Sequence, residues 1–210
     1  MTPTVQLLLL INGVVFLIQQ YADPFLIRWF ALWPLGSPGL VMTPQGFWRV
    51  PEFELWQLVS YGFLHGGLLH IFFNMFGLWM FGVPLEQLWG ARRFLHYYFV
   101  CVVGAGLVQL LVSSLLVDRA GGFYPTVGAS GGVLGVLMAF AMMYPNRLIM
   151  LVFPPIPMKA KWFVVFFAGF TLWAGITGTQ AGVAHFAHLG GMLFGFLMIQ
   201  YWRRRWPFGR

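Results

Sequence analysis

A single hydroxyl and a few imidazole and amide side chains could do chemistry in this sequence. Ser130 lies in the stretch YPTVGASGGVLGVLMAF (124–140), among small residues at the start of an apolar segment of helix length. His70 and Asn74 are four residues apart in another apolar segment, so they would share one face of a helix. Polar side chains in apolar segments are costly, which makes each of them a candidate for a functional role.

These residue types favour serine hydrolysis. A nucleophilic serine needs a base within hydrogen-bond reach and donors aimed at the oxyanion. His188 in the last apolar segment supplies a candidate base, and Gly191 gives that segment a flat surface that can meet the glycines around Ser130. Because no acidic residue is expected inside an apolar span, the machinery would be a Ser–His dyad rather than a triad.

Two other sites are weaker hypotheses. Metal binding could use four histidines, namely His65, His70, His185 and His188. A histidine-only site lacks the carboxylate that usually orients or completes such a site, so we expect no metal and no cofactor. The pattern Gly128-x-Ser130-x-Gly132 also matches the nucleophile elbow of α/β-hydrolases, but that elbow needs a preceding strand and a soluble sheet, which this composition excludes.

The composition is that of a polytopic membrane protein. The 210 residues are 60% hydrophobic and 8% charged, with a mean hydropathy of +0.78. A membrane-spanning helix needs about 20 mainly apolar residues. We therefore predict an all-α bundle of six transmembrane helices in a single domain, 1–210. The predicted spans are 5–21, 64–84, 94–116, 128–144, 161–178 and 184–202, the last two being divided by GITGTQAG (175–182).

The basic residues predict the orientation. Nine lie on the side of the N-terminus: Arg92, Arg93, Arg147, Lys159, Lys161, Arg203, Arg204, Arg205 and Arg210. Three lie on the other side: Arg28, Arg49 and Arg119. This bias places both termini in the cytoplasm and Ser130 near the outer side. Because the cations flank spans instead of sharing one face, we expect the lipid bilayer and no nucleic acid as partner, and no obligate protein partner is evident.

The connection between the first two spans, about Ala22 to Leu58, is long and apolar. It is rich in aromatic residues and prolines. Aromatic rings prefer the membrane boundary, and the prolines argue against a simple spanning helix. Two interpretations stay open: an interfacial loop with short helices in the outer leaflet, and an ordinary extracytoplasmic loop.

The sequence resembles the rhomboid family of intramembrane serine proteases from about Phe53 to Tyr201. Three elements carry the resemblance, in the family's order and spacing: HGGLLHIFFN (65–74), GASGG (128–132) and AHLGGMLFG (187–195). The resemblance implies a rhomboid-like six-helix bundle with a membrane-embedded first loop. It also implies an endopeptidase that hydrolyses a peptide bond in or near the transmembrane segment of membrane-protein substrates, through an acyl-enzyme. The bare six-span core suggests a bacterial plasma membrane.

The resemblance also assigns roles to residues. Ser130 would be the nucleophile, and His188, with glycines at +3 and +7, would be the base in preference to His185. The oxyanion hole would comprise the side chains of His70 and Asn74 and the backbone N–H groups of Ser130 and Ala129. Supporting positions would be His65, near the water-filled mouth, Leu134, Gly128 and Gly191.

The chain departs from the family at two positions. Where the family often has Trp-Arg, this chain has Trp56-Gln57. The dipeptide Trp-Arg does occur, as Trp48-Arg49, but eight residues earlier. Where many relatives place Tyr or Phe against the catalytic imidazole, it has Leu134. The alternative function is therefore a catalytically weak or dead relative that binds transmembrane clients. A channel is a third possibility, but the polar residues cluster near one side and form no through-route.

Overall fold

The structure is a computed structural model that describes residues 1–36, 39–43, 46–115, 124–150, 155–178 and 184–205. Seven α-helices lie in these ranges: α1 Pro3–Phe30, α2 Gln57–Ser60, α3 Leu68–Trp89, α4 Ala91–Leu115, α5 Ser130–Met143, α6 Ala160–Thr177 and α7 His185–Arg205. A 3-10 helix, η1 Tyr61–Phe63, follows α2. Several predicted features lie outside the described residues, namely residue 116, residues 179–182, Pro38, Pro44, Arg119 and Arg210.

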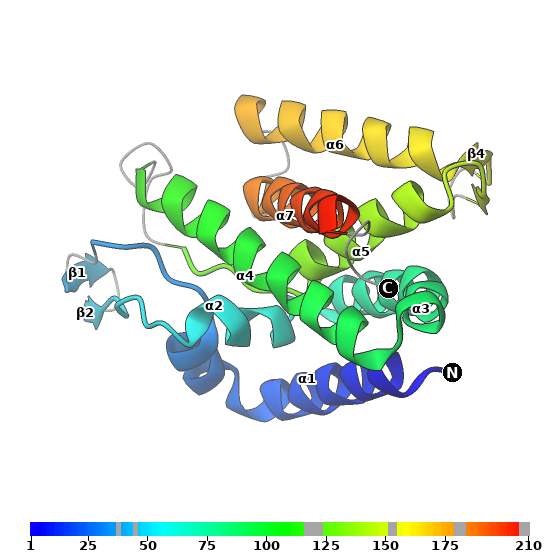
Figure 1. The fold of residues 1–210 in the computed structure, drawn as a ribbon. Coiled ribbons are helices and arrows are strands. Elements are labelled where there is room, and N and C mark those ends of the chain that lie inside the picture. Colours follow the sequence, from blue (N-terminus) through cyan, green and yellow to red (C-terminus); the bar gives the residue numbers. More distant parts are fainter. Residues whose placement is uncertain (37–38, 44–45, 116–123, 151–154, 179–183, 206–210) are drawn as a thin grey trace.

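Two small antiparallel hairpins interrupt the helices. The first pairs β1 Leu40–Thr43 with β2 Gly46–Arg49. The second pairs β3 Leu148–Met150 with β4 Pro157–Lys159. Figure 1 shows the β1–β2 hairpin at one end of the bundle and the start of α1 and the β3–β4 hairpin at the other. This arrangement is consistent with the predicted orientation, in which the N-terminus and the α5–α6 connection share a side.

The prediction of an all-α polytopic membrane protein is confirmed. Four of the described helices are long and apolar enough to cross a membrane, namely α1, α3, α4 and α6, and α5 is a shorter apolar helix. Each of the six predicted spans coincides with one helix, apart from shifts at the ends. The number of membrane crossings stays a prediction.

The predicted end of the first span, at residue 21, coincides with a kink in α1. α1 continues to Phe30, through a kink at Ala22, whose backbone is non-helical (φ −122°, ψ 25°). Pro24 lies inside the helix, and its ring and missing N–H disturb the turn before it, which accounts for a kink at this place. The predicted connection from about Ala22 to Leu58 therefore begins with a second helical piece, residues 23–30, and it holds a β-hairpin as well as the expected short helices.

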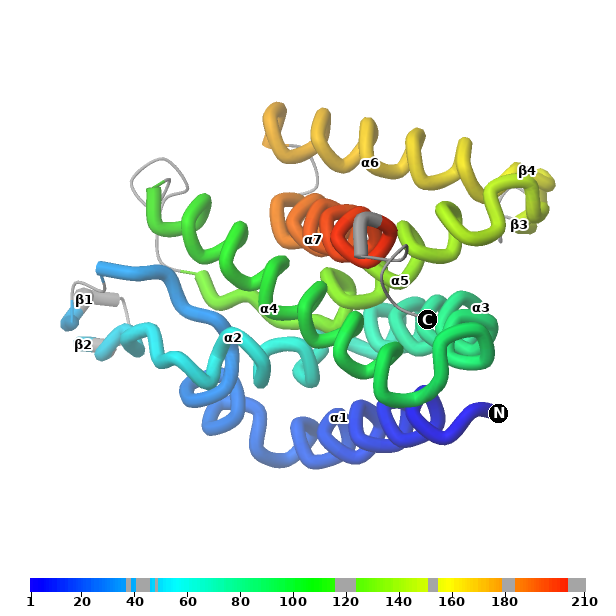
Figure 2. Tube along the Cα trace, in the orientation of Figure 1, coloured from blue at the N-terminus to red at the C-terminus, as the bar shows by residue number. Residues whose placement is uncertain are grey.

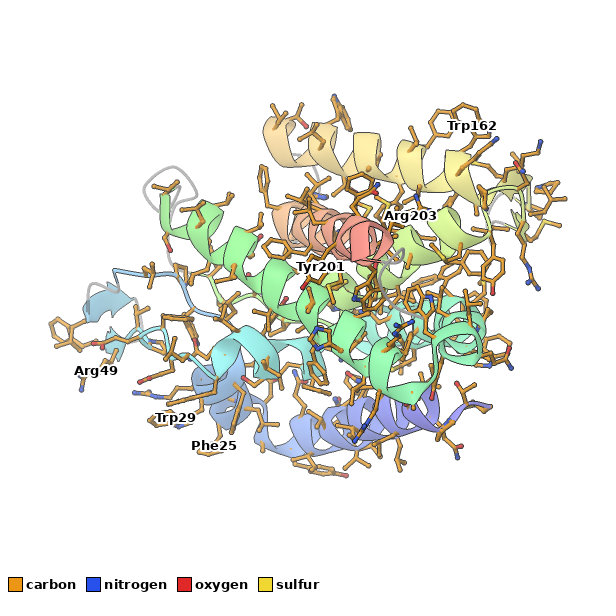
Figure 3. The ribbon with its side chains drawn as sticks, in the orientation of Figure 1. Phe25, Trp29, Arg49, Trp162, Tyr201 and Arg203 are labelled. Atoms are coloured by element: carbon orange, nitrogen blue, oxygen red, sulfur yellow. The ribbon has the colours of Figure 1, made fainter. Side chains whose placement is uncertain are left out.

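Aromatic side chains are exposed at both ends of the bundle, as interfacial anchors would be. Phe25 and Trp29 lie near the end that carries the first hairpin, and Trp162 lies near the opposite end (Figure 3). All three are more than two fifths exposed, at 59%, 45% and 52%. Their position supports the interfacial interpretation of the first connection over an ordinary extracytoplasmic loop.

Gln57, which stands where the family often has arginine, anchors that first connection. Its side chain is 1% exposed. Oε1 accepts a hydrogen bond from the backbone N–H of Trp33 (3.2 Å), and Nε2 donates to the carbonyls of Trp29 (3.5 Å) and Glu52 (3.4 Å). A neutral amide thus joins the end of α1, the segment after it and the approach to α2 without burying a charge.

One buried acidic residue lies in the last turn of α3, at the edge of the predicted span 64–84. Glu86 is 3% exposed, and its two carboxylate oxygens accept hydrogen bonds from the N–H groups of Thr4 and Val5, both at 2.8 Å. It therefore caps the start of α1, where unpaired N–H groups and the helix dipole favour an anion. Asp23 likewise lies inside α1.

The short helix α5 occupies the centre of the bundle, with α3, α4, α6 and α7 around it (Figures 1 and 2). Its 14 residues give a length of about 21 Å, which is less than the roughly 30 Å of membrane hydrocarbon. A helix this short can begin below the outer membrane surface while its neighbours cross fully. Ser130, the first residue of α5, is then held within the protein.

Glycines bring the backbones of α5 and α7 together. A Cβ on Gly191 would collide with the carbonyl oxygen of Gly131, and a Cβ on Gly135 would lie 2.9 Å from the carbonyl oxygen of Gly191. The hydroxyl of Tyr97 in α4 donates to the carbonyl of Gly135 (2.7 Å), where a side chain on Gly195 would also intrude. Close backbone approach at small residues is how membrane helices gain packing energy.

Adding a methyl group at Gly191 should therefore destabilise the bundle. The obstacle is backbone, which cannot rotate away, so we expect Gly191→Ala to lower the free energy of unfolding by about 1–3 kcal/mol or more. Gly169→Ala is the matched control, because Gly169 lies in α6 with nothing within 4 Å of an added Cβ. Thermal unfolding in detergent should show a lower Tm for Gly191→Ala only. Equal Tm values for both variants would contradict the packing described.

Candidate active site

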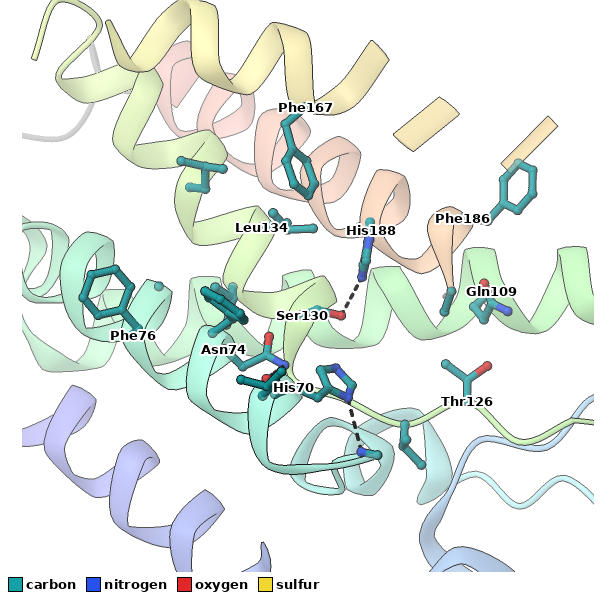
Figure 4. Close-up of a pocket in the computed structure, with 18 of the residues that line it drawn as sticks. His70, Asn74, Phe76, Gln109, Thr126, Ser130, Leu134, Phe167, Phe186 and His188 are labelled. Carbon is teal, nitrogen blue, oxygen red and sulfur yellow. Dashed lines mark hydrogen bonds between the residues drawn. The ribbon is translucent and has the colours of Figure 1, made fainter. Parts of the chain in front are cut away.

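Ser130 and His188 are in direct contact. The Nε2 of His188 lies 2.8 Å from the Oγ of Ser130 (Figure 4). Ser130 opens α5, and His188 lies in the first turn of α7, 58 residues later in the chain. At this distance a serine hydroxyl can donate to an unprotonated Nε2 and pass its proton to it. The pair meets as the dyad hypothesis requires.

The start of α5 presents unpaired backbone donors. The first helical hydrogen bond of α5 runs from the N–H of Val133 to the carbonyl of Ala129 (3.0 Å). The N–H groups before Val133 in the helix therefore have no acceptor within it. The preceding chain is fixed by the N–H of Gly128, which donates to the carbonyl of Tyr61 (2.9 Å). The helix end that carries Ser130 is thus oriented and rich in donors.

His70 is held with its Nε2 facing the start of α5. The N–H of Gly66 donates to Nδ1 of His70 (3.2 Å). In a neutral imidazole that accepts at Nδ1, the proton is on Nε2, which makes Nε2 a donor. A Cβ on Gly128 would lie 2.7 Å from both Cε1 and Nε2 of His70. The bare backbone of Gly128, at φ +128°, leaves room for this ring.

Asn74 lies one turn after His70, and both line the same cavity. Its side chain is 6% exposed, and its Nδ2 donates to the carbonyl of His70 (3.0 Å). An amide group carries two N–H donors. One of them therefore orients the side chain, and the other is left for a ligand.

The cavity beside Ser130 has a volume of about 910 Å³ and is walled mainly by apolar side chains. It extends from His188 and the segment before α5 to Ile149 and Met150 of the second hairpin. α3, α5, α6 and α7 all contribute to its wall. A space of this length and polarity suits an apolar polypeptide segment better than a small polar molecule.

Two further histidines lie near the pair without entering it. His65 is 1% exposed and packs edge-on behind His70, with ring centroids 5.2 Å apart. It is not among the residues that line the cavity, so the structure places it behind the oxyanion candidates rather than at a mouth. The ring of His185 lies 6.3 Å from that of His188. Among the described residues, no group of three or more possible metal ligands was found.

Sequence reasoning missed two side chains near His188. Phe167 of α6 lies with its ring centroid 6.4 Å from that of His188, at an interplanar angle of 44° (Figure 4). Leu134, which is 8% exposed, lies on the same cavity wall. The second missed residue is Gln109 of α4, whose Oε1 accepts from the N–H of Ala187 (3.2 Å) at the start of α7. Gln109 could have been found as an uncharged polar residue within a predicted span.

Comparison with known proteins gives the family. A model of the rhomboid domain matches residues 52–205. The presenilin-associated rhomboid-like protein, mitochondrial, of Rattus norvegicus is 32% identical over 157 residues, which cover 69% of this chain and 39% of that protein. Rhomboid protein 1, mitochondrial, of Saccharomyces cerevisiae is 32% identical over 181 residues, covering 78% and 51%. Rhomboid protease GlpG of Serratia proteamaculans is 29% identical over 196 residues, covering 91% and 59%.

The apolar helices and their arrangement define an all-α integral membrane protein. Within that class, the chain belongs to the rhomboid family. It spans 39% to 59% of the length of the three relatives named above. The family includes intramembrane serine proteases.

The contact between Gly128 and His70 can be tested through stability. Gly128→Ala adds a Cβ that overlaps the His70 ring and strains a backbone at positive φ. Gly90→Ala is the control, because Gly90 also has positive φ (+81°) but open space around it. We expect Gly128→Ala to lower the free energy of unfolding by about 1–3 kcal/mol more than Gly90→Ala. This excess should disappear when His70 is also changed to Ala, and its persistence there would show that the ring is not the obstacle.

Proposed function

We propose that this chain is an intramembrane serine endopeptidase with Ser130 as nucleophile and His188 as general base. The observation that carries the proposal is the 2.8 Å contact between Oγ of Ser130 and Nε2 of His188 at the wall of a large apolar cavity. Membership of a family that includes intramembrane serine proteases supports the same reaction class. A relative of similar sequence is itself described as a rhomboid protease.

The proposed reaction proceeds in two halves. In acylation, Oγ of Ser130 attacks the scissile carbonyl while His188 takes the hydroxyl proton, and the tetrahedral intermediate then expels the amine, which receives that proton from His188. In deacylation, His188 takes a proton from water, which attacks the acyl-enzyme; the second tetrahedral intermediate then expels Oγ of Ser130, which receives that proton from His188, and the acid is released. Each half begins and ends with a neutral imidazole, so the dyad is regenerated.

The oxyanion would be stabilised by donors from two elements. His70 would donate from Nε2 and Asn74 from its second amide N–H, both on α3. The start of α5 would add the backbone N–H of Ser130 and that of Ala129. Donors fixed before the reaction are worth more than water because they need no reorganisation as the charge develops. His65 would support this set by packing behind His70.

The substrate would be a transmembrane segment of another membrane protein. Its apolar side chains fit the cavity, which runs along α5 between α3 and α6. Predicted outer-side placement of Ser130 would give water access to the acyl-enzyme from outside the membrane. The membrane itself stays a prediction, because two of the relatives above are described as mitochondrial and one comes from a bacterium.

The second candidate is a weak or inactive relative that binds transmembrane clients. It is favoured by Leu134, which stands where many relatives have an aromatic residue. The presence of both Ser130 and His188 in contact favours the active form. The two candidate functions share a fold and a cavity. They differ in the reactivity of Ser130, which is therefore the property to measure.

Cleavage of a model transmembrane substrate in proteoliposomes tests the dyad. Ser130→Ala removes the nucleophile and His188→Ala removes the base, so we expect each to lower the cleavage rate by at least about a thousandfold. Both substitutions reduce side-chain volume near an existing cavity, so their Tm values should stay near that of the wild type. His185→Ala is the matched control and should keep most of the activity. Cleavage at the wild-type rate in either dyad variant would refute the assignment.

The ring of Phe167 should support His188 in place of the missing aromatic residue at Leu134. An aromatic pair contributes about 0.5–1.5 kcal/mol, so we expect Phe167→Leu to lower kcat by about 2- to 10-fold. Adding Leu134→Phe should restore part of this loss by supplying a ring from α5.

Phe166→Leu is the matched control, because Phe166 is adjacent in α6 but 64% exposed. Its kcat should equal that of the wild type. The effect of Phe167→Leu should lie in kcat, since an orienting contact acts on the chemical step. An unchanged or increased kcat for Phe167→Leu would show that the ring does not position the imidazole.

A further inference from the structure

A glutamine of α1 is joined to the chain segment that precedes α3. Gln19 is 4% exposed. Its Oε1 accepts from the backbone N–H of His65 (3.0 Å), and its Nε2 donates to the backbone carbonyl of the same residue (3.0 Å). Nε2 also donates to Oδ1 of Asp23 one turn further along α1 (2.8 Å). One side-chain amide thus pairs with both polar backbone groups of His65, as a neighbouring strand would.

The segment so held has little structure of its own. It lies between the end of η1 at Phe63 and the start of α3 at Leu68, and its residues are not helical. It contains Gly66 and Gly67, and Gly67 has φ +153°. Glycines have the largest conformational freedom of all residues, so such a segment takes a defined path only when outside contacts fix it. The two bonds from Gln19 supply that fixation.

The fixed segment in turn holds His70. Gly66, directly after His65, donates its N–H to Nδ1 of His70 (3.2 Å). This contact selects the neutral imidazole that carries its proton on Nε2. Nε2 faces the start of α5, where a Cβ on Gly128 would lie 2.7 Å away. A continuous set of contacts therefore runs from α1 through the His65 backbone and the Gly66 N–H to the side chain that would donate to the oxyanion.

We propose that Gln19 is a positioning residue for His70: by pairing with the backbone of His65 it fixes the tautomer and the orientation in which His70 donates from Nε2. The inference rests on the proposed function for its catalytic consequence. The rhomboid-domain match covers residues 52–205, so α1 lies outside it, and the role of Gln19 follows from these contacts alone. α1 would then be a part of the catalytic apparatus rather than only a membrane anchor.

Gln19→Met tests the proposal, because Met has similar length and no hydrogen-bonding group. We expect kcat for a transmembrane substrate to fall about tenfold, less than the 10²–10³ that removal of an oxyanion donor typically costs, with KM little changed. Gln20→Met is the matched control: Gln20 is exposed, and the hydrogen bond of its side chain within the described part of the chain is to the carbonyl of Phe16 in α1 (2.9 Å). Its kcat should equal that of the wild type.

A double-mutant comparison separates positioning from general stabilisation of the bundle. If Gln19 acts through His70, Gln19→Met should lower the residual rate of a His70→Ala protein by less than about twofold. A tenfold loss in both backgrounds, or an equal loss in Gln20→Met, would overturn the proposal. Should Gln19→Met fail to fold, Gln19→Asn takes its place with the same expectation, because it keeps a neutral polar side chain but is one methylene too short to pair with both backbone groups of His65.

A readout independent of activity is the ¹⁵N NMR spectrum of protein labelled in its histidines. The His70 signals should show a protonated Nε2 and an unprotonated Nδ1 in the wild type and in Gln20→Met, and a mixture of tautomers in Gln19→Met. Identical His70 signals in all three proteins would refute the positioning role. If the wild type cleaves no faster than Ser130→Ala, the proposed function fails, and the spectra still decide whether Gln19 orders His70.

Discussion

The close approach of the α5 and α7 backbones is the constraint on which the rest of the site depends. Where a Cβ on Gly191 would strike the carbonyl of Gly131, no other side chain fits without moving one helix. One turn before Gly191 lies His188, and directly before Gly131 lies Ser130, so the same contact sets the 2.8 Å distance between Nε2 and Oγ. In the proposed dyad, helix packing would do the orienting that a carboxylate does in a triad, without burying a charge.

The other parts of the site are fixed in the same way, by backbone contacts and neutral amides. Gln57 holds the first connection, Gln109 holds the start of α7, and Gln19 holds the segment before α3. Amides satisfy buried backbone groups at a lower desolvation cost than charged side chains. In a bundle of apolar helices, neutral amides can therefore fix the conformation of irregular segments without burying a charge.

Apolar length predicted the helices, because it is a local signal. The family resemblance pointed to Ser130 and His188, the latter by Gly191 three residues after it, and the structure brings these two side chains into contact. The helical piece after Ala22 was expected only as one of the short helices of the first connection, because Pro24 argues against a continuous spanning helix; its direct junction with the first span through a kink at Ala22 was not predicted. Gln19, like Gln109, could have been found as a polar residue within a predicted span, but its contact with His65 and that of Phe167 with His188 join distant parts of the chain and have no local signal. The partners of Glu86 were not predicted, because they depend on the position of the start of α1.

The most direct test of the account is reaction of the purified protein with a fluorophosphonate, followed by mass spectrometry of the modified residue. An activated serine forms a covalent adduct with such a probe, whereas an ordinary hydroxyl does not. The account predicts that Ser130 is labelled in the wild type, and that His188→Ala protein of unchanged Tm is labelled far more slowly. Labelling of Ser130 at the same rate without His188, or no labelling of the wild type, would contradict it.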